Sequence, residues 1–296
     1  MNHVWNATQE KEKGPGVLHV AFSVTRLPKC GFAVLSSGLA ALLVAVAGYA
    51  AAQDHTQAVN ELAPTGTLRA GINFGNALLT KRPSPGGAPS GVAVDLAAEL
   101  AKRLGVPLTL VEYDGPGQAA DAATQGVWDV VFIAAGPERG ATIDFSPPYV
   151  QLEATYLVGA DSPIQAVEQA DREGIRIGVG AGTAYELYLT RTLRHAELKR
   201  VRTNAEAVKL LQQGQIEAVA ALGEMLQPFT QTVPGSRVLP GHFALADQAV
   251  GTPKGRPAGV KFLKQFIEDA KSAGLIHELI MRNGARGLVV APPAAN

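Results

Sequence analysis

An uninterrupted apolar segment in the middle of the chain constrains the fold more than any other feature. Residues 130–135 read Val-Val-Phe-Ile-Ala-Ala, with the length and β-branched content of a buried strand. A strand that is apolar at every position is typical of a parallel sheet covered on both faces. Gly136-Pro137 ends the segment, and Arg139 follows two residues later. Because ligands of open α/β sheets bind beyond the carboxyl ends of strands, Arg139 could hold a carboxylate; the alternative is an exposed loop arginine.

Composition indicates a folded protein with a sizeable core. Of the 296 residues, 47% are hydrophobic and 18% are charged, which excludes general disorder. Lys plus Arg and Asp plus Glu both number 26, so the formal net charge is zero. This balance gives no indication of nucleic-acid binding.

The first 52 residues have the pattern of an N-terminal extension followed by a signal peptide. Arg26 and Lys29 precede an apolar or small-residue run over 30–52, which ends in Ala50-Ala51-Ala52-Gln53. This ending predicts cleavage after Ala52 and export to the periplasm, the alternative being an uncleaved anchor. The only cysteine, Cys30, lies at the start of this run and so within the predicted leader, and the mature protein is therefore expected to have no disulfide or thiol chemistry.

Elements of an α/β fold follow the leader. Residues 53–63 are predicted to be an irregular linker and 67–72 a strand. Next we expect a helix capped by Asp95 and ended by Gly105, and then a strand over 106–111. This βαβ order predicts a parallel sheet with helical crossovers.

The second half of the chain echoes the first. Residues 68–72, Leu-Arg-Ala-Gly-Ile, correspond to Ile-Arg-Ile-Gly-Val at 175–179. Likewise Gln-Gly-Val-Trp-Asp-Val-Val at 125–131 corresponds to Gln-Gly-Gln-Ile-Glu-Ala-Val at 213–219. The echo suggests two α/β lobes of similar plan. Helices are expected over 257–273 and 275–282, followed by a frayed tail at 291–294.

Together these motifs resemble the bacterial extracellular solute-binding proteins of family 3, the polar amino-acid type of ABC-transporter receptors. The resemblance covers nearly all of residues 64–284 and depends on the order and spacing of several short motifs. These are Gly66-Thr67-Leu68-Arg69, Gly91-Val92-Ala93-Val94-Asp95-Leu96, Trp128-Asp129, Glu138-Arg139, Ile143-Asp144-Phe145-Ser146-Pro147-Pro148-Tyr149 and Gly182-Thr183.

The resemblance implies a type II periplasmic-binding-protein fold, in which two hinge strands join two α/β lobes around a ligand cleft. Lobe 1 would comprise residues 60–152 plus 247–296, and lobe 2 residues 153–246, after the leader 1–52. The implied function is the periplasmic substrate-binding component of an ABC transporter. It would capture a small polar carboxylate-bearing solute by hinge closure, as a monomer, and deliver it to a membrane ABC permease.

The resemblance also assigns candidate ligand-binding residues. Arg139 would pair with the ligand carboxylate, and Thr183 would bind at the start of a helix or simply cap it. Asn73 and Asn76 would either contact the ligand or form turns. The remaining candidates are Ala135, Gly136, Ala184 and Tyr185, of which Tyr185 could equally be a core residue.

Three positions depart from the family pattern. Gly136 stands where the family usually has serine or threonine, and Ala184 where a second threonine is common. Leu222 stands where amino-acid receptors commonly have an aspartate that accepts the ligand's ammonium group. Either Glu224 or Glu153 replaces this aspartate, or the ligand has no α-ammonium group, which we favour.

Two other functions are compatible with such a scaffold. One is a dehydratase-like enzyme, for which Glu153 and Glu224 are the only proton-transfer candidates. The other is a sensory protein that presents ligand to a membrane receptor. No cofactor is expected, because residues 178–183 lack the lysine of a phosphate loop and the histidines lack metal-ligand spacing.

Overall fold

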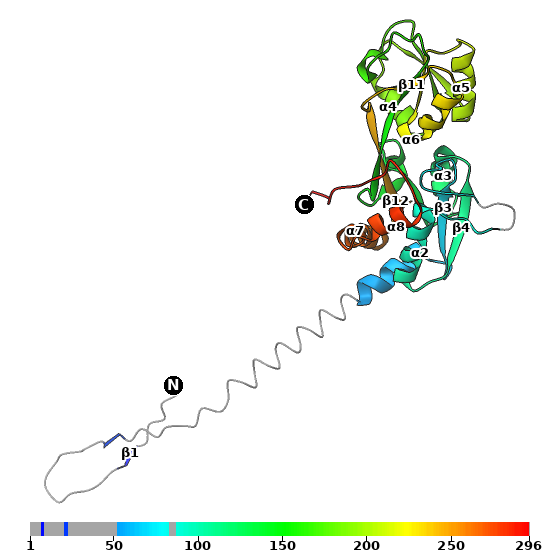
Figure 1. The fold of residues 1–296 in the computed structure, drawn as a ribbon. Coiled ribbons are helices and arrows are strands. Elements are labelled where there is room, and N and C mark those ends of the chain that lie inside the picture. Colours follow the sequence, from blue (N-terminus) through cyan, green and yellow to red (C-terminus); the bar gives the residue numbers. More distant parts are fainter. Residues whose placement is uncertain (1–6, 9–20, 23–51, 83–86, 296) are drawn as a thin grey trace, which may run out of the picture. The chain divides into compact units, whose positions relative to one another are not determined.

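A computed structural model describes residues 7–8, 21–22, 52–82 and 87–295 (Figure 1). Contacts divide the chain into two units, Met1–Ala52 and Gln53–Asn296. In the first unit, β1 (Ala7–Thr8) pairs antiparallel with β2 (Ala21–Phe22). The predicted apolar run and its cleavage site lie outside the described residues, apart from Ala52.

The second unit is an α/β structure built on one continuous set of hydrogen-bonded strands. The strands are β3 (Leu68–Asn73), β4 (Leu108–Tyr113), β5 (Val130–Ala134), β6 (Ile143–Phe145), β7 (Val150–Val158), β8 (Arg176–Gly180), β9 (Glu197–Val201), β10 (Ala218–Leu222), β11 (Arg237–Val238), β12 (Ala244–Pro253) and β13 (Val289–Val290). The α-helices are α2 (Val92–Leu104), α3 (Pro116–Asp121), α4 (Ala184–Thr192), α5 (Asn204–Gln212), α6 (Gly223–Leu226), α7 (Pro257–Ser272) and α8 (Leu275–Arg282), with a further helix over 52–62.

The strand order separates two similar halves. The order is β4-β3-β5-β12-β7-β10-β8-β9. In the first half β3 pairs parallel with β4 and β5, and in the second half β8 pairs parallel with β9 and β10. Helices α2, α3, α7 and α8 lie beside the first half, and α4, α5 and α6 beside the second (Figure 1). The predicted two-lobed α/β fold is therefore confirmed, with parallel pairing within each half and antiparallel pairing where β7 and β12 join them.

The sequence echo corresponds to the same hydrogen-bonded clamp in each lobe. In the first lobe Arg69 donates to Asp129 through Nε (2.9 Å) and Nη2 (2.8 Å), and Nη1 donates to the carbonyl of Gly126 (2.7 Å). In the second lobe Arg176 donates to Glu217 through Nε (3.1 Å) and Nη2 (2.5 Å). Its Nη2 also donates to the Gly214 carbonyl (2.8 Å). Each clamp joins an arginine at the start of one parallel strand to the turn that precedes the neighbouring strand.

Two long strands, β7 and β12, connect the lobes. They pair antiparallel from Ala244 opposite Ala154 to Gln248 opposite Val150. Beyond this shared segment, β12 pairs with β5 of the first lobe and β7 pairs with β10 of the second. β7 and β12 are thus the two hinge strands that the resemblance implies, and they pass from one lobe to the other (Figure 1).

Three local predictions are wrong or incomplete. Residues 53–63 are not an irregular linker, because 52–62 form a helix whose Ala58 and Leu62 are buried. Asp95 does not cap α2, which begins after Gly91; its carboxylate instead accepts a hydrogen bond from Asn283 (2.8 Å). The tail is not wholly frayed, since Ala291 is buried and donates to the Tyr149 carbonyl (3.1 Å).

Candidate ligand-binding site

Arg139 lies where the two lobes meet, in a 3₁₀ turn (Arg139–Ala141) that follows β5 and the Gly136-Pro137 breaker. The residue is only 5% exposed. Its Nη1 donates to the Ala134 carbonyl at the end of β5, and its Nη2 donates to the Gly182 carbonyl of the second lobe (2.7 Å). Burial lowers the pKa of Arg139 to about 10, against the opposing effect of Glu138, so the guanidinium stays charged at neutral pH. Of its five N–H groups, three remain for a ligand.

Thr183 faces Arg139 from the second lobe, where it is the N-cap of α4. Its hydroxyl accepts from the Glu186 backbone N–H (3.2 Å) and donates to the Gly180 carbonyl (2.8 Å). The capping alternative therefore holds in this structure. The Glu186 carboxylate also lies at the start of α4. It accepts hydrogen bonds from the Gly182 N–H (3.3 Å) and from Arg200 Nε (2.8 Å).

Asn73 and Asn76 both form turns after β3, as the turn alternative predicts. The Asn73 side-chain oxygen accepts from the Gly75 N–H (3.0 Å), and that of Asn76 accepts from the Leu78 N–H (3.2 Å). Both residues are 7% exposed. Their Nδ2 groups have no hydrogen-bond partner within the described part of the chain. Turn formation and ligand contact are thus compatible, because the turns use the side-chain oxygens and leave the Nδ2 groups to donate to a ligand.

Most of the predicted residues line one small cavity between the lobes. Its volume is about 50 Å³, room for a few water molecules. The lining residues are Asn73, Gly75, Asn76, Pro116, Ala134, Arg139, Thr183, Ala184, Tyr185, Leu222, Met225, Ala246 and Gln248. Six of the eight predicted site residues are in this set, and Ala135 and Gly136 are not.

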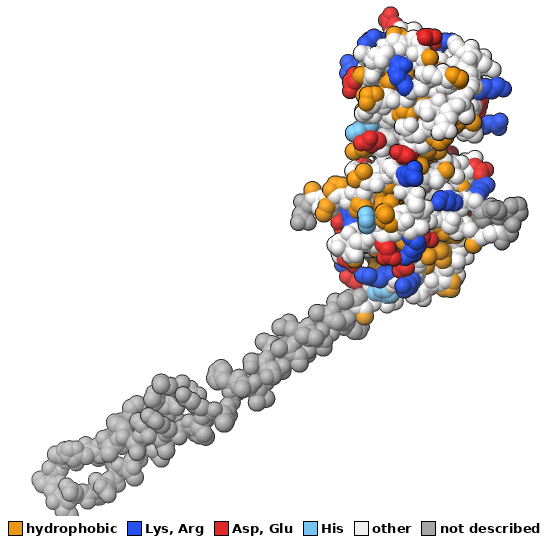
Figure 2. Space-filling view, viewed as in Figure 1, with side chains coloured by type: hydrophobic (Ala, Val, Ile, Leu, Met, Phe, Trp, Pro, Cys, Tyr) orange, Lys and Arg blue, Asp and Glu red, His pale blue; other side chains and the backbone are white. Residues whose placement is uncertain are grey.

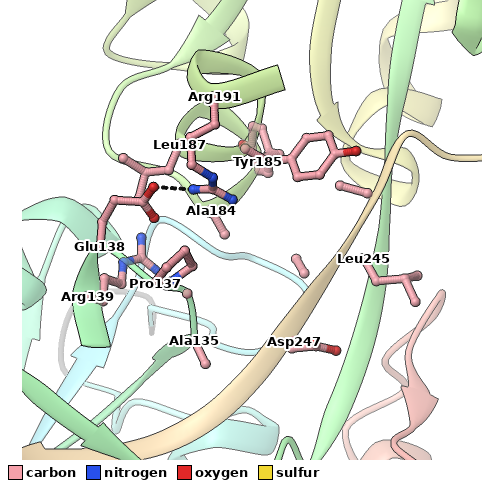
Figure 3. Close-up of a pocket in the computed structure, with 14 residues that line it drawn as sticks. Ala135, Pro137, Glu138, Arg139, Ala184, Tyr185, Leu187, Arg191, Leu245 and Asp247 are labelled. Atoms are coloured by element: carbon pink, nitrogen blue, oxygen red, sulfur yellow. Dashed lines mark hydrogen bonds and ion pairs between the residues drawn. The ribbon is translucent and has the colours of Figure 1, made fainter. Parts of the chain in front are cut away.

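Ala135 and Gly136 line a larger neighbouring cavity of about 200 Å³ (Figure 3). This cavity shares Arg139, Ala184 and Tyr185 with the smaller one. At one edge an ion pair joins Glu138 of the first lobe to Arg191 of α4 (Figure 3). Leu187 and Leu245 also line the cavity. The two cavities together therefore provide a charged end at Arg139 and a wider, partly apolar chamber beside it.

The two glutamates considered as substitutes for the missing aspartate lie elsewhere. Glu153 and Glu224 line a separate cavity of about 340 Å³ that does not include Arg139. Glu153 is 61% exposed at its side chain and pairs with His242 (3.2 Å). Leu222 itself is buried at the end of β10 and lines the Arg139 cavity. Neither glutamate occupies the position of an ammonium acceptor in this arrangement.

Sequence reasoning missed Gln248, Met225 and Ala246. Gln248 is 5% exposed, and its side-chain amide has no hydrogen-bond partner in the ranges that the structure describes. Strand alternation on β12 places Ala246 and Gln248 on one face, toward the cavity. A polar residue inside an otherwise apolar hinge segment was the available signal. Phe74, between Asn73 and Asn76, lies against Arg82, whose guanidinium carbon is 5.1 Å from the ring centroid.

The described residues contain neither a metal-binding cluster nor a helix suited to span a membrane. They hold no group of three or more His, Cys, Asp or Glu side chains arranged to bind a metal ion. None of their helices is both long and apolar enough to span a membrane. On the face seen in Figure 2, basic and acidic side chains are interspersed and neither sign forms a broad patch.

The family model for bacterial extracellular solute-binding proteins, family 3, matches residues 68–284. The chain belongs to this family, whose members are two-lobed extracellular receptors for small solutes, as the sequence motifs predict. A curated relative is the L-cystine-binding protein TcyJ of Escherichia coli K12. It is 26% identical over 199 residues, which cover 64% of this chain and 72% of the relative.

Solved structures share the fold. The ancestral amino-acid-binding protein AncCDT-1, a precursor of cyclohexadienyl dehydratase, is 25% identical with a TM-score of 0.63, covering 76% of this chain and 98% of that one. The substrate-binding protein AbpA from Streptococcus pneumoniae, bound to L-arginine, is 21% identical with a TM-score of 0.63, covering 75% and 96%. The type II periplasmic-binding-protein fold and a solute-binding function are thus both confirmed.

Proposed function

We propose that this protein is the periplasmic substrate-binding component of an ABC transporter and captures a small carboxylate-bearing solute through Arg139. The observation that carries the proposal is a buried arginine, at the meeting point of two lobes, whose hydrogen bonds go only to backbone carbonyls. No carboxylate forms an ion pair with Arg139 in the described part of the chain. A buried guanidinium favours a bidentate anionic partner, and a ligand carboxylate supplies one.

Capture would proceed by closure of the lobes on the solute. We assign lobe 1 to residues 60–152 plus 247–296 and lobe 2 to 153–246, since β7 and β12 cross between them at these limits. Arg139 of lobe 1 and the α4 start of lobe 2 would both contact the carboxylate. Contacts from both lobes stabilise the closed form over the open one. A cavity of about 50 Å³ requires the lobes to separate, or the solute to extend into the neighbouring cavity.

Binding and transport explain the site better than catalysis does. Glu153 and Glu224, the proton-transfer candidates in the sequence, line a cavity without Arg139. Glu138 and Asp247 line the cavity of about 200 Å³ beside Arg139, but Glu138 is ion-paired with Arg191 and Asp247 accepts a hydrogen bond from Gln151. A dehydratase would need such a group beside the bound acid. We further propose that the chain is exported with cleavage after Ala52. The mature protein would act as a monomer and deliver its solute to a membrane permease.

The test is calorimetric titration of residues 53–296, a separate compact unit, with a panel of carboxylic and amino acids. Arg139→Ala is expected to weaken binding of the tightest acid by about 2–5 kcal/mol, because a buried charge pair loses one partner. Arg139→Lys keeps the charge but loses the planar fork, so we expect only partial recovery.

Circular dichroism spectra and thermal unfolding of both variants serve as folding controls. Unchanged affinity in well-folded Arg139→Ala would refute the role of Arg139. Conversion of an acid to product at saturating concentration would favour the enzyme instead.

A further inference from the structure

We propose that the Arg139 cavity selects carboxylates whose neighbouring polar group accepts hydrogen bonds, such as 2-oxo acids, over the corresponding α-amino acids. Acids with a 2-hydroxyl group, which can also accept, belong to the same selected class. This inference rests on the proposed function and specifies the substrate class of that same site.

The formal charge of the cavity lining is the first observation. Arg139 is the only charged residue that lines the cavity of about 50 Å³, whereas Glu138, Arg191 and Asp247 also line the cavity of about 200 Å³ beside it. Three carboxylates act electrostatically on Arg139, and none of them lines this cavity of about 50 Å³. Glu186 bonds to Arg200 (2.8 Å), Glu138 pairs with Arg191, and Asp121 lines a different cavity. Asp247 accepts from Gln151 (2.7 Å) and projects from β12 away from Arg139 (Figure 3). The lining of the cavity of about 50 Å³ thus offers one positive charge and no negative charge.

The supply of hydrogen-bond donors is the second observation. Asn73 and Asn76 use their oxygens in turns, which leaves their Nδ2 groups as donors. The Thr183 hydroxyl donates to the Gly180 carbonyl, so its proton is committed. The Ala134 and Gly182 carbonyls already accept from Arg139. Among the polar side chains that line the cavity, Gln248 alone carries an amide oxygen with no hydrogen bond in the described ranges.

An ammonium group fits this environment poorly. It presents three donors and no acceptor, whereas an oxo group presents only acceptors. The second-lobe wall beside it is apolar, formed by Leu222 and Met225. Burying an ammonium without a counter-charge is costly, and a site with unmatched donors discriminates strongly between ligands. The donors on Asn73 and Asn76 instead match an acceptor next to the carboxylate.

Matched ligand triplets test the selection. Each triplet shares one carbon skeleton, for example pyruvate, L-lactate and L-alanine, or phenylpyruvate, L-phenyllactate and L-phenylalanine, and the series extends to basic, acidic and amide side chains. Calorimetry on residues 53–296 is expected to give the oxo or hydroxy acid an affinity at least about tenfold above that of its amino acid.

This inference would be overturned if the amino acids bound as tightly as the corresponding oxo acids, or more tightly. The proposed function would still be supported if that binding were lost in Arg139→Ala. If no acid of the series binds, or if binding persists in Arg139→Ala, the proposed function fails and the inference fails with it.

Leu222→Asp provides a second, internal test, with Leu222→Asn as its neutral control. Leu222 is the N-cap of α6 and makes no side-chain capping bond. Both replacements are favoured at such positions, so the helix is expected to persist. Only Leu222→Asp adds the missing counter-charge, and it should shift the ratio of amino-acid to oxo-acid affinity by about tenfold toward the amino acid.

An equal ratio in wild type, Leu222→Asp and Leu222→Asn would contradict the inference. If Leu222→Asp does not fold, Met225→Glu with Met225→Gln as control places the charge on the same wall from a half-buried position.

Discussion

Arg139 combines a full positive charge with nearly complete burial, and its hydrogen bonds within the described residues go only to carbonyl oxygens. Desolvation disfavours its charged form, as the lowered pKa of about 10 indicates. A ligand carboxylate would relieve this penalty at the moment of binding. Arg139 is therefore expected to contribute strongly to the binding of a carboxylate.

Tyr149 presents a second unsatisfied group at the residue scale. It is fully buried in the first lobe, and its hydroxyl has no hydrogen-bond partner in the described part of the molecule. Tyr149→Phe removes the hydroxyl and preserves the edge contact with Phe132 at 6.5 Å between ring centroids. We expect it to raise the free energy of unfolding by about 1 kcal/mol. Urea denaturation measures this change, and a clear loss of stability would show that the hydroxyl has a partner.

Residues at the ends of strands were predictable from sequence, and residues on the hinge were not. Arg139 and Thr183 follow apolar strands with glycine-containing breaks, so their position at the carboxyl edge follows from local pattern alone. Gln248 faces the cavity because β12 pairs in register with β5, Gln248 lying opposite Ala134. Register between strands more than a hundred residues apart depends on tertiary packing, which the local sequence does not reveal.

At the element scale, the two arginine clamps differ in burial and therefore in expected contribution. The Asp129 side chain is 0% exposed and also receives Arg256 Nη1 (3.3 Å). Asp129→Asn leaves two arginines without their counter-charge and is expected to cost about 3–5 kcal/mol. Glu217→Gln acts on a pair with side chains 34% and 30% exposed, so about 1 kcal/mol or less is expected. Urea denaturation compares the two, and equal losses would contradict this difference.

The Glu217 clamp also predicts a pH dependence. The hydrogen bond from Arg176 holds the pKa of Glu217 below its ordinary value of 4.5. The unfolded chain therefore binds the proton more readily, and the stabilisation is present above about pH 4.5 and lost as the pH falls through the lower folded value. The difference in unfolding free energy between wild type and Glu217→Gln should be constant near neutral pH and shrink as the pH falls below 4.5. A difference that grows on acidification would contradict this sign.

The helix over 52–62 shows why one element was missed. Its sequence is mostly polar and carries no strong start signal, so propensity alone favoured a linker. Ala58 and Leu62 are four residues apart, lie on one helix face and are buried. Glu61 additionally accepts from the Gly259 N–H at the start of α7 (2.7 Å). Packing against a segment almost two hundred residues away decides this conformation.

At the scale of the whole molecule, close approach of the lobes depends on two glycines. Gly117 of α3 and Gly182 before α4 meet backbone to backbone, so that a Cβ on Gly117 would lie 3.3 Å from Gly182 Cα. Gly117→Ala is expected to weaken ligand affinity about tenfold, because overpacking opposes closure. Gly115→Ala, whose Cβ would meet nothing within 4 Å, is the matched control. Calorimetry on both variants checks this, and equal affinities would show that closure tolerates the added methyl group.

Recognition of the solute carboxylate by Arg139 can be measured with a thermodynamic cycle. The tightest ligand and its primary amide are titrated into wild type and Arg139→Gln. We predict that conversion to the amide costs about 100-fold in affinity for wild type and almost nothing for Arg139→Gln, since the recognised pair is already absent. The same loss of affinity in both proteins would show that the carboxylate binds to a residue other than Arg139.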